Sequence, residues 1–183
     1  MKKIHFFLFF TIIRQISTYM LNIICLAFEC RGDTMKKYEI NKNTAAIVGL
    51  DEENSKVIEE NKEYHIEDRS YSVMEHSCRY FGCTYQGRLI GSKCILGSKY
   101  KVPIIVEESN NIIFFPTTDI ENPQCMWISL KWFDRVEEDK DGNTYIYLKN
   151  GKRISTSISK NSIENQALKS IKLDFLISSR KKC

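Results

Sequence analysis

The sequence predicts an α+β domain with a mostly antiparallel sheet, one or two central helices and a C-terminal amphipathic helix. Three observations predict this fold class. Strand-like apolar runs flank the turn signal Asn150-Gly151, residues 70–82 carry apolar side chains at helical spacing, and residues 161–175 repeat apolar side chains every four positions. The chain has 183 residues, of which 43% are hydrophobic and 27% charged. This composition suits one globular domain and excludes a disordered or collagen-like chain.

The first half of the domain is expected to contain short strands followed by helices. Residues 38–66 suggest short strands, of which 44–48 is the clearest. Apolar residues recur at helical spacing over 70–82, which predicts a helix. A second, weaker helix is predicted over 84–96, where two glycines interrupt the pattern.

The second half is expected to continue the sheet. Residues 102–106 and 112–115 predict paired strands joined by a polar turn, and residues 127–136 alternate as one long strand. Residues 144–148 and 153–158 flank the Asn-Gly pair, which is the strongest local signal for a β-hairpin.

The last element is expected to be a helix that begins at Asn161, because Asn161 and Glu164 resemble a capping box. The stripe predicted to face the sheet consists of Ile163, Ala167, Leu168, Ile171 and Phe175. Lys169 and Lys172 project roughly opposite that stripe. The end of the chain, residues 180–183, is expected to be frayed.

Residues 1–34 form an apolar leader that is interpreted apart from the domain at 35–183. They lack the small-residue cleavage site of a signal peptide, and Arg14 and Gln15 interrupt the span of a transmembrane helix. The composition is rich in residues with A/T-rich codons, and an AT-rich upstream frame encodes apolar residues without selection. We therefore expect a misassigned translation start, with synthesis beginning at Met35. A signal or membrane segment and a soluble helix are the alternatives.

Charge is segregated along the domain. Residues 38–68 and 102–148 each carry a net charge of −6, whereas residues 69–101 carry +5 and residues 149–183 carry +7. Such alternation often reflects solvated faces only. The alternative is that the two basic blocks meet in space and form a surface for nucleic acid.

Neither catalysis nor metal binding is expected. Four residues lie between Cys78 and Cys83, but no second pair completes a zinc site, so these thiols are interpreted as small buried side chains. The sequence contains no Gly-x-Ser-x-Gly, no phosphate-binding glycine loop and no His-Glu-x-x-His. We therefore expect no enzyme, no cofactor and no metal.

Residues 77–88 are the best candidate for direct contact with a ligand. Arg79 and Arg88 lie among tyrosines and glycines, where a backbone can approach a ligand closely. Arginine side chains insert into the narrow, electronegative minor grooves of A-tracts. The alternative is that both arginines pair with the glutamate-rich segments nearby.

A collinear series of motifs resembles the competence transcription factor ComK family. The motifs are Ser77–Gly82, Tyr85 with Gly87-Arg88, Gly91, Ile113–Thr117, Pro123–Cys125 with Trp127-Ile128, Asn150–Lys152, Ser159 and Asn161–Gln166. The resemblance covers roughly residues 37–177. It implies a cytoplasmic activator of the genes for DNA uptake and recombination.

The resemblance also implies partners. Family members bind paired A-rich and T-rich boxes of double-stranded DNA, largely through the minor groove, as dimers that assemble further and help RNA polymerase use the promoter. A C-terminal tail of the best-known members is recognised by an adaptor that delivers them to a Clp-type protease. Because this chain stops at Cys183, we expect recognition by that adaptor and full activation of transcription less strongly. The alternatives are a non-activating protein–protein interaction module or degenerate paralogue of the same fold and, third, a membrane-tethered form.

The candidate DNA-binding residues have two different origins. Arg79 and Arg88 fall within the family motifs and suit A-tract minor grooves, and Lys152 follows the hairpin turn, where it is placed for phosphate contact. The other candidates rest on charge alone. The complete set is Arg79, Arg88, Lys93, Lys152, Arg153, Lys169 and Lys172.

Overall fold

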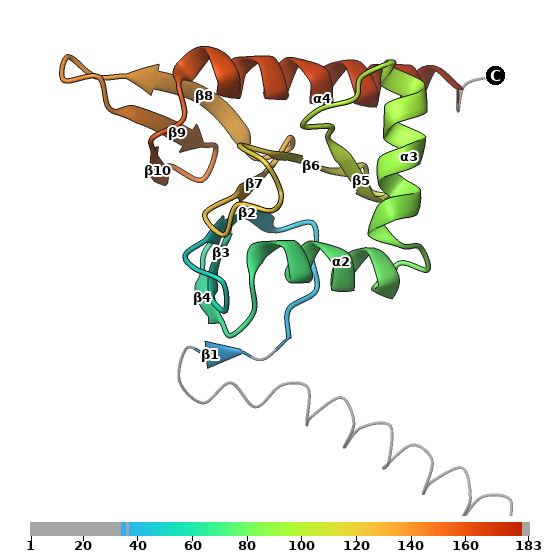
Figure 1. Cartoon of the computed structure of the whole chain (residues 1–183), viewed down its shortest axis with the longest axis horizontal. Helices are drawn as coiled ribbons and strands as arrows, with labels where there is room; N and C mark the ends of the chain where they lie inside the picture. Colours follow the sequence, from blue (N-terminus) through green and yellow to red (C-terminus); the bar gives the residue numbers. More distant parts are fainter. Residues whose placement is uncertain (1–33, 36, 181–183) are drawn as a thin grey trace, which may run out of the picture. The chain divides into compact units, whose positions relative to one another are not determined.

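The computed structural model describes residues 34–35 and 37–180 (Figure 1). Their helices and antiparallel sheets make an α+β fold, as predicted. The expectations for the leader and for residues 181–183 fall outside the described residues. None of the helices in the described part is long and apolar enough to cross a membrane.

The described helices coincide with the three predicted regions. They are α2 (Ser70–Tyr80), α3 (Tyr85–Leu96) and α4 (Lys160–Arg180). The side-chain oxygen of Thr84 accepts a hydrogen bond from the Gly87 N–H at 3.0 Å and caps the start of α3. Gly97, with a φ of 64°, ends the helix in the left-handed conformation that glycine adopts without penalty.

Two sheets complete the fold. Seven strands pair in the order β1-β4-β3-β2-β7-β6-β5, antiparallel except for the β1–β4 pair. They are β1 (Thr34–Met35), β2 (Thr44–Gly49), β3 (Ser55–Glu59), β4 (Glu63–Ile66), β5 (Ile104–Glu107), β6 (Ile112–Pro116) and β7 (Met126–Ser129). The second, antiparallel sheet has the order β10-β9-β8 and consists of β8 (Phe133–Glu138), β9 (Thr144–Leu148) and β10 (Arg153–Thr156). The β5–β6 pair and the β9–β10 hairpin confirm two of the predictions.

The larger sheet lies between two hydrophobic cores. Ile47 and Trp127 are in the core that contains α2 and the start of α3. Their neighbours Ala46 and Ile128 are in the core formed with the smaller sheet and the first half of α4. Successive side chains of a strand point to opposite faces, so strands buried on both sides supply both cores.

The single long strand predicted over 127–136 is wrong. The chain forms β7 and β8 instead, in different sheets, and turns between them. Trp132 holds this turn: its backbone N–H donates to the Ser129 carbonyl at 3.2 Å and its indole N–H donates to the Lys42 carbonyl at 3.1 Å. Apolar alternation continues through both strands, so it cannot reveal where the chain leaves one sheet for the other.

Two predictions about α4 are wrong. The helix begins at Lys160, so Asn161 lies inside it and does not cap it. Leu168, Ile171 and Phe175, expected against the sheet, are 60%, 53% and 69% exposed. The buried residues are Ile163, Gln166, Ala167, Ser170 and Leu173. A four-residue repeat advances about 40° beyond a full turn at each step, so a stripe with that period leaves the buried face within three steps.

Candidate nucleic-acid interface

Arg88 lies in α3 and is engaged by an acidic neighbour. Its Nη1 donates to Glu108 Oε1 at 2.5 Å, and only 17% of its side chain is exposed. Its Nε is buried without a hydrogen-bond partner among the described residues. Glu108 follows β5, so this ion pair ties α3 to the β5–β6 turn, as the alternative of pairing with glutamates predicted.

Arg79 lies in the last turn of α2 and is more accessible. Its Nη2 donates to Glu75 Oε1 at 2.9 Å, one helical turn earlier, and 59% of its side chain is exposed. An exposed ion pair of this spacing contributes about 0.3–0.5 kcal/mol. Arg79 could therefore exchange Glu75 for a phosphate at little cost.

The β9–β10 hairpin holds Lys152 and Arg153 in a separate environment. Lys152 Nζ is 3.0 Å from Glu63 Oε1, and Lys56 Nζ is 2.9 Å from Glu63 Oε2. Hydrogen bonds from Lys56 and Lys152 lower the pKa of the Glu63 carboxyl. The guanidinium of Arg153 lies 4.9 Å from the ring centre of Tyr145 on the same sheet.

The remaining candidates meet on one surface with residues that sequence analysis did not select. The lining of one pocket includes Lys93, Lys99, Tyr100 and Lys101 together with one acidic residue, Asp119, and the lining of another includes Lys101, Lys169 and Lys172. Lys101 lines both pockets. The end of α3 and the helix α4 contact each other beside this region (Figure 1). We call these six residues the lysine surface: Lys93, Lys99, Tyr100, Lys101, Lys169 and Lys172.

The electrostatics of the lysine surface favour an anionic ligand. None of its five lysines forms a salt bridge with another described residue. Tyr100 is 80% exposed between two of them. An exposed aromatic ring flanked by ammonium groups can stack on a base while the lysines bind phosphates.

The loop between α3 and β5 is held against α4. Lys169 Nζ donates to the Tyr100 carbonyl at 3.1 Å, and Lys101 has a φ of 47°. In the sequence, this loop shows only the alternation Lys-Tyr-Lys after Gly97. The alternation lies within the basic block 69–101, but no motif distinguishes it from the rest of that block. Arg79, Arg88, Lys152 and Arg153 line neither of the two pockets of the lysine surface.

The cysteines of the described part are free thiols in different environments. Burial raises the pKa of Cys78 to about 12 and that of Cys125 to about 11, whereas Cys94 is exposed. Among residues 34–35 and 37–180, no group of three or more His, Cys, Asp or Glu side chains is arranged to hold a metal ion.

Comparisons with known proteins identify the class. Residues 35–182 match the family described as ComK protein. Over 138 aligned residues the chain is 36% identical to the competence transcription factor of Bacillus subtilis strain 168. The aligned region covers 72% of this chain and 70% of that relative. No solved structure matches the chain. The name of that relative is the name of a transcription factor. The chain belongs to the ComK family.

Proposed function

We propose that the chain is a DNA-binding activator of competence genes that binds paired A/T-rich boxes of double-stranded DNA, mainly through the minor groove. The observation that carries DNA binding is the lysine surface, which has five lysines without salt-bridge partners in the described part and an exposed tyrosine. Neutralising backbone phosphates releases counterions from DNA, which is the main source of sequence-independent affinity. The kinship with a competence transcription factor supports the same conclusion.

Selectivity for A/T-rich boxes is assigned to Arg79 and Arg88. A guanidinium favours the negative potential of a narrow minor groove. To enter it, Arg79 must release Glu75 and Arg88 must release Glu108. The lysine surface would then provide affinity and the arginines discrimination.

Self-association, contact with RNA polymerase and a cytoplasmic location belong to the same proposal. A protein that reads paired boxes does so most simply as a dimer with two-fold symmetry. The exposed stripe of α4, formed by Leu168, Ile171 and Phe175, is the surface we assign to a second copy.

The test measures binding of the full chain to two duplexes by fluorescence anisotropy. One duplex carries two phased A/T boxes, and a GC-rich duplex of equal length is the control. Each is titrated at several salt concentrations. We expect tight binding that favours the A/T duplex and falls steeply as salt rises. Weak and equal binding to both duplexes by folded protein would contradict the proposal and favour a non-activating interaction module.

A further inference from the structure

A pocket of about 480 Å³ lies between α4 and the loop that follows α3. Its lining residues are Lys101, Ser162, Asn165, Gln166, Leu168, Lys169 and Lys172. None of these is acidic, and three of them carry an ammonium group. The pocket is therefore a concentrated positive site that no acidic lining residue offsets.

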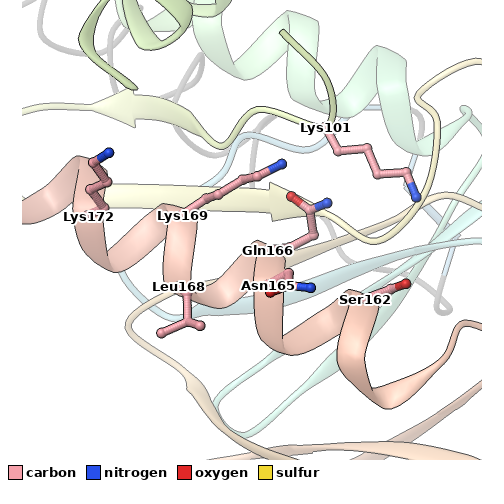
Figure 2. Close-up of a pocket in the computed structure, with 7 residues that line it drawn as sticks. All are labelled: Lys101, Ser162, Asn165, Gln166, Leu168, Lys169 and Lys172. Atoms are coloured by element: carbon pink, nitrogen blue, oxygen red, sulfur yellow. The ribbon is translucent and has the colours of Figure 1, made fainter. Parts of the chain in front are cut away.

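Three of the lining side chains, Lys101, Gln166 and Lys169, bring their polar ends toward one another from two elements (Figure 2). Figure 2 shows the Gln166 amide between the ammonium groups of Lys101 and Lys169, while Leu168 points away. Lys169 also donates to the Tyr100 carbonyl at 3.1 Å, which fixes the loop that carries Lys101 relative to α4. The spacing of the charges is thus set by the fold, because a tethered loop supplies one and a long helix supplies the others.

The buried side of the pocket has an unmet hydrogen-bonding requirement. Gln166 is 5% exposed, and its Oε1 is buried without a partner among the described residues. A buried polar atom without a partner is costly and needs a specific explanation. Oε1 only accepts hydrogen bonds, so a hydration water carried in with a ligand would donate the missing bond to it, while the Nε2–H of the same amide can donate to the ligand.

The backbone at the rim is also in a conformation that costs free energy. Lys101 has a φ of 47°, a left-handed value that a lysine rarely adopts. Residues held in such conformations concentrate at binding and active sites, where the surrounding structure enforces them. Figure 2 shows the ammonium group of Lys101 on the same side of α4 as the Gln166 amide.

We propose that this pocket binds a single phosphate group, held by the ammonium groups of Lys101 and Lys169 and by the neutral amide of Gln166. The phosphate has two possible sources, a phosphodiester of DNA or a free phosphate or phosphate monoester. The first source rests on the proposed function, and the second does not.

Inorganic phosphate is the first probe, added to the full chain while its thermal unfolding is followed. Ionic strength is kept constant with sodium chloride. We expect phosphate to raise the melting temperature in a saturable manner, and Lys101→Asn and Lys169→Gln to weaken the apparent affinity roughly tenfold each. Asparagine tolerates the left-handed backbone, so Lys101→Asn tests the charge and not the strain. Lys140→Gln, which removes the same charge from the β8–β9 turn, is the matched control.

The second probe is an A/T duplex in which one phosphate at a time is replaced by a neutral methylphosphonate. If DNA supplies the phosphate, one position weakens binding by the wild-type chain and has no effect on the Lys169→Gln variant. A response to inorganic phosphate without a sensitive position assigns the pocket to a free phosphate. If neither probe distinguishes the pocket variants from Lys140→Gln, the phosphate site is overturned. If the phosphate site is overturned but binding still favours the A/T duplex, the proposed function stands. If inorganic phosphate binds in the pocket but the chain does not bind DNA, the proposed function is overturned and the phosphate site stands.

Discussion

Gly49 and Gly91 are placed under opposite steric constraints. A Cβ on Gly49 would lie 2.1 Å from the Pro123 carbonyl oxygen and 2.8 Å from that of Cys125, both backbone atoms. A Cβ on Gly91, within α3, would meet no atom within 4 Å. We expect Gly49→Ala to destabilise the fold by about 1–3 kcal/mol and Gly91→Ala to stabilise it by about 0.5–1 kcal/mol. Urea unfolding followed by circular dichroism measures the free energy of unfolding of both variants. If the two substitutions change it equally, Gly49 is not in tight contact with the backbone of Pro123 and Cys125.

The pair Arg88–Glu108 predicts how selectivity for A/T-rich DNA is controlled. If Arg88 enters the minor groove, Arg88→Ala lowers the ratio of A/T to GC affinity. Glu108→Gln raises that ratio, because a neutral amide holds the guanidinium less strongly than a carboxylate does. We expect changes of roughly fivefold, the effect of about 1 kcal/mol. Competition binding at fixed salt measures the ratio. If both variants keep the wild-type ratio, Arg88 serves only to tie α3 to the sheet.

At the scale of single elements, Glu63 of β4 links the two sheets through Lys152 and predicts a pH dependence. Its pKa is lowered by hydrogen bonds from Lys56 and Lys152, so the charged carboxylate is the form that the fold stabilises. This contribution is complete above the unfolded pKa of about 4.3 and is lost as the pH falls through the lower folded pKa. Glu63→Gln should therefore lower the melting temperature at pH 7. The difference from wild type should vanish in more acidic buffer.

The control for this pH dependence is Glu53→Gln, an exposed carboxylate whose side chain forms no salt bridge with a described residue. It should melt like wild type at every pH. A Glu63→Gln difference that persists at pH 3 would mean that the carboxylate acts through packing and not through charge.

The stripe on α4 predicts concentration-dependent self-association. Phe175→Ser removes the most exposed apolar side chain of the stripe, and burying such a side chain contributes about 1.5–3 kcal/mol. We therefore expect dimer dissociation to become easier by at least roughly tenfold, measured by sedimentation equilibrium. Ile90→Ser, an isolated residue on α3 that is 53% exposed, is the control. If Phe175→Ser dissociates no more readily than the control Ile90→Ser, the stripe does not bind a second copy of the chain.

The elements themselves were largely predictable from the sequence, because local patterns determine them. The strands β5 and β6 follow from two continuous apolar runs on either side of a polar turn, and the β9–β10 hairpin follows from Gly151, whose φ of 81° suits a tight turn. The division of residues 127–136 into β7 and β8 was not predictable, since it depends on a distant partner, the Lys42 carbonyl that binds Trp132. The exposed face of α4 was mistaken for the buried one because both carry apolar residues.

The candidate site is formed by residues that are far apart in the sequence, so it depends on the fold of the whole domain. Lys93 and Lys169 are 76 positions apart in the sequence, and charge alone selected both. Their proximity depends on the packing of α3 against α4 through a small core of Ile105, Ile113 and Leu173, with Ile95 and Leu96 beside it. Lys99 and Lys101 carry no motif, so only that packing identifies them as part of the surface.

The last prediction compares two pairs of basic residues with the same total charge. Lys169→Gln/Lys172→Gln changes the lysine surface, and Lys152→Gln/Arg153→Gln changes the β9–β10 hairpin. Both remove two positive charges, so an interaction that depends on net charge alone would weaken equally in the two variants. If the lysine surface contacts the DNA backbone, the first pair lowers the slope of log affinity against log salt by about 2.

The same loss should apply to A/T and GC duplexes alike, because phosphate contacts carry no sequence information. We expect the hairpin pair to change the slope less, since Lys152 is already neutralised by Glu63. Anisotropy titrations of both variants at four salt concentrations measure these slopes. A larger loss for the hairpin pair would place the DNA on the smaller sheet, and the β9–β10 hairpin would then replace the lysine surface as the binding surface.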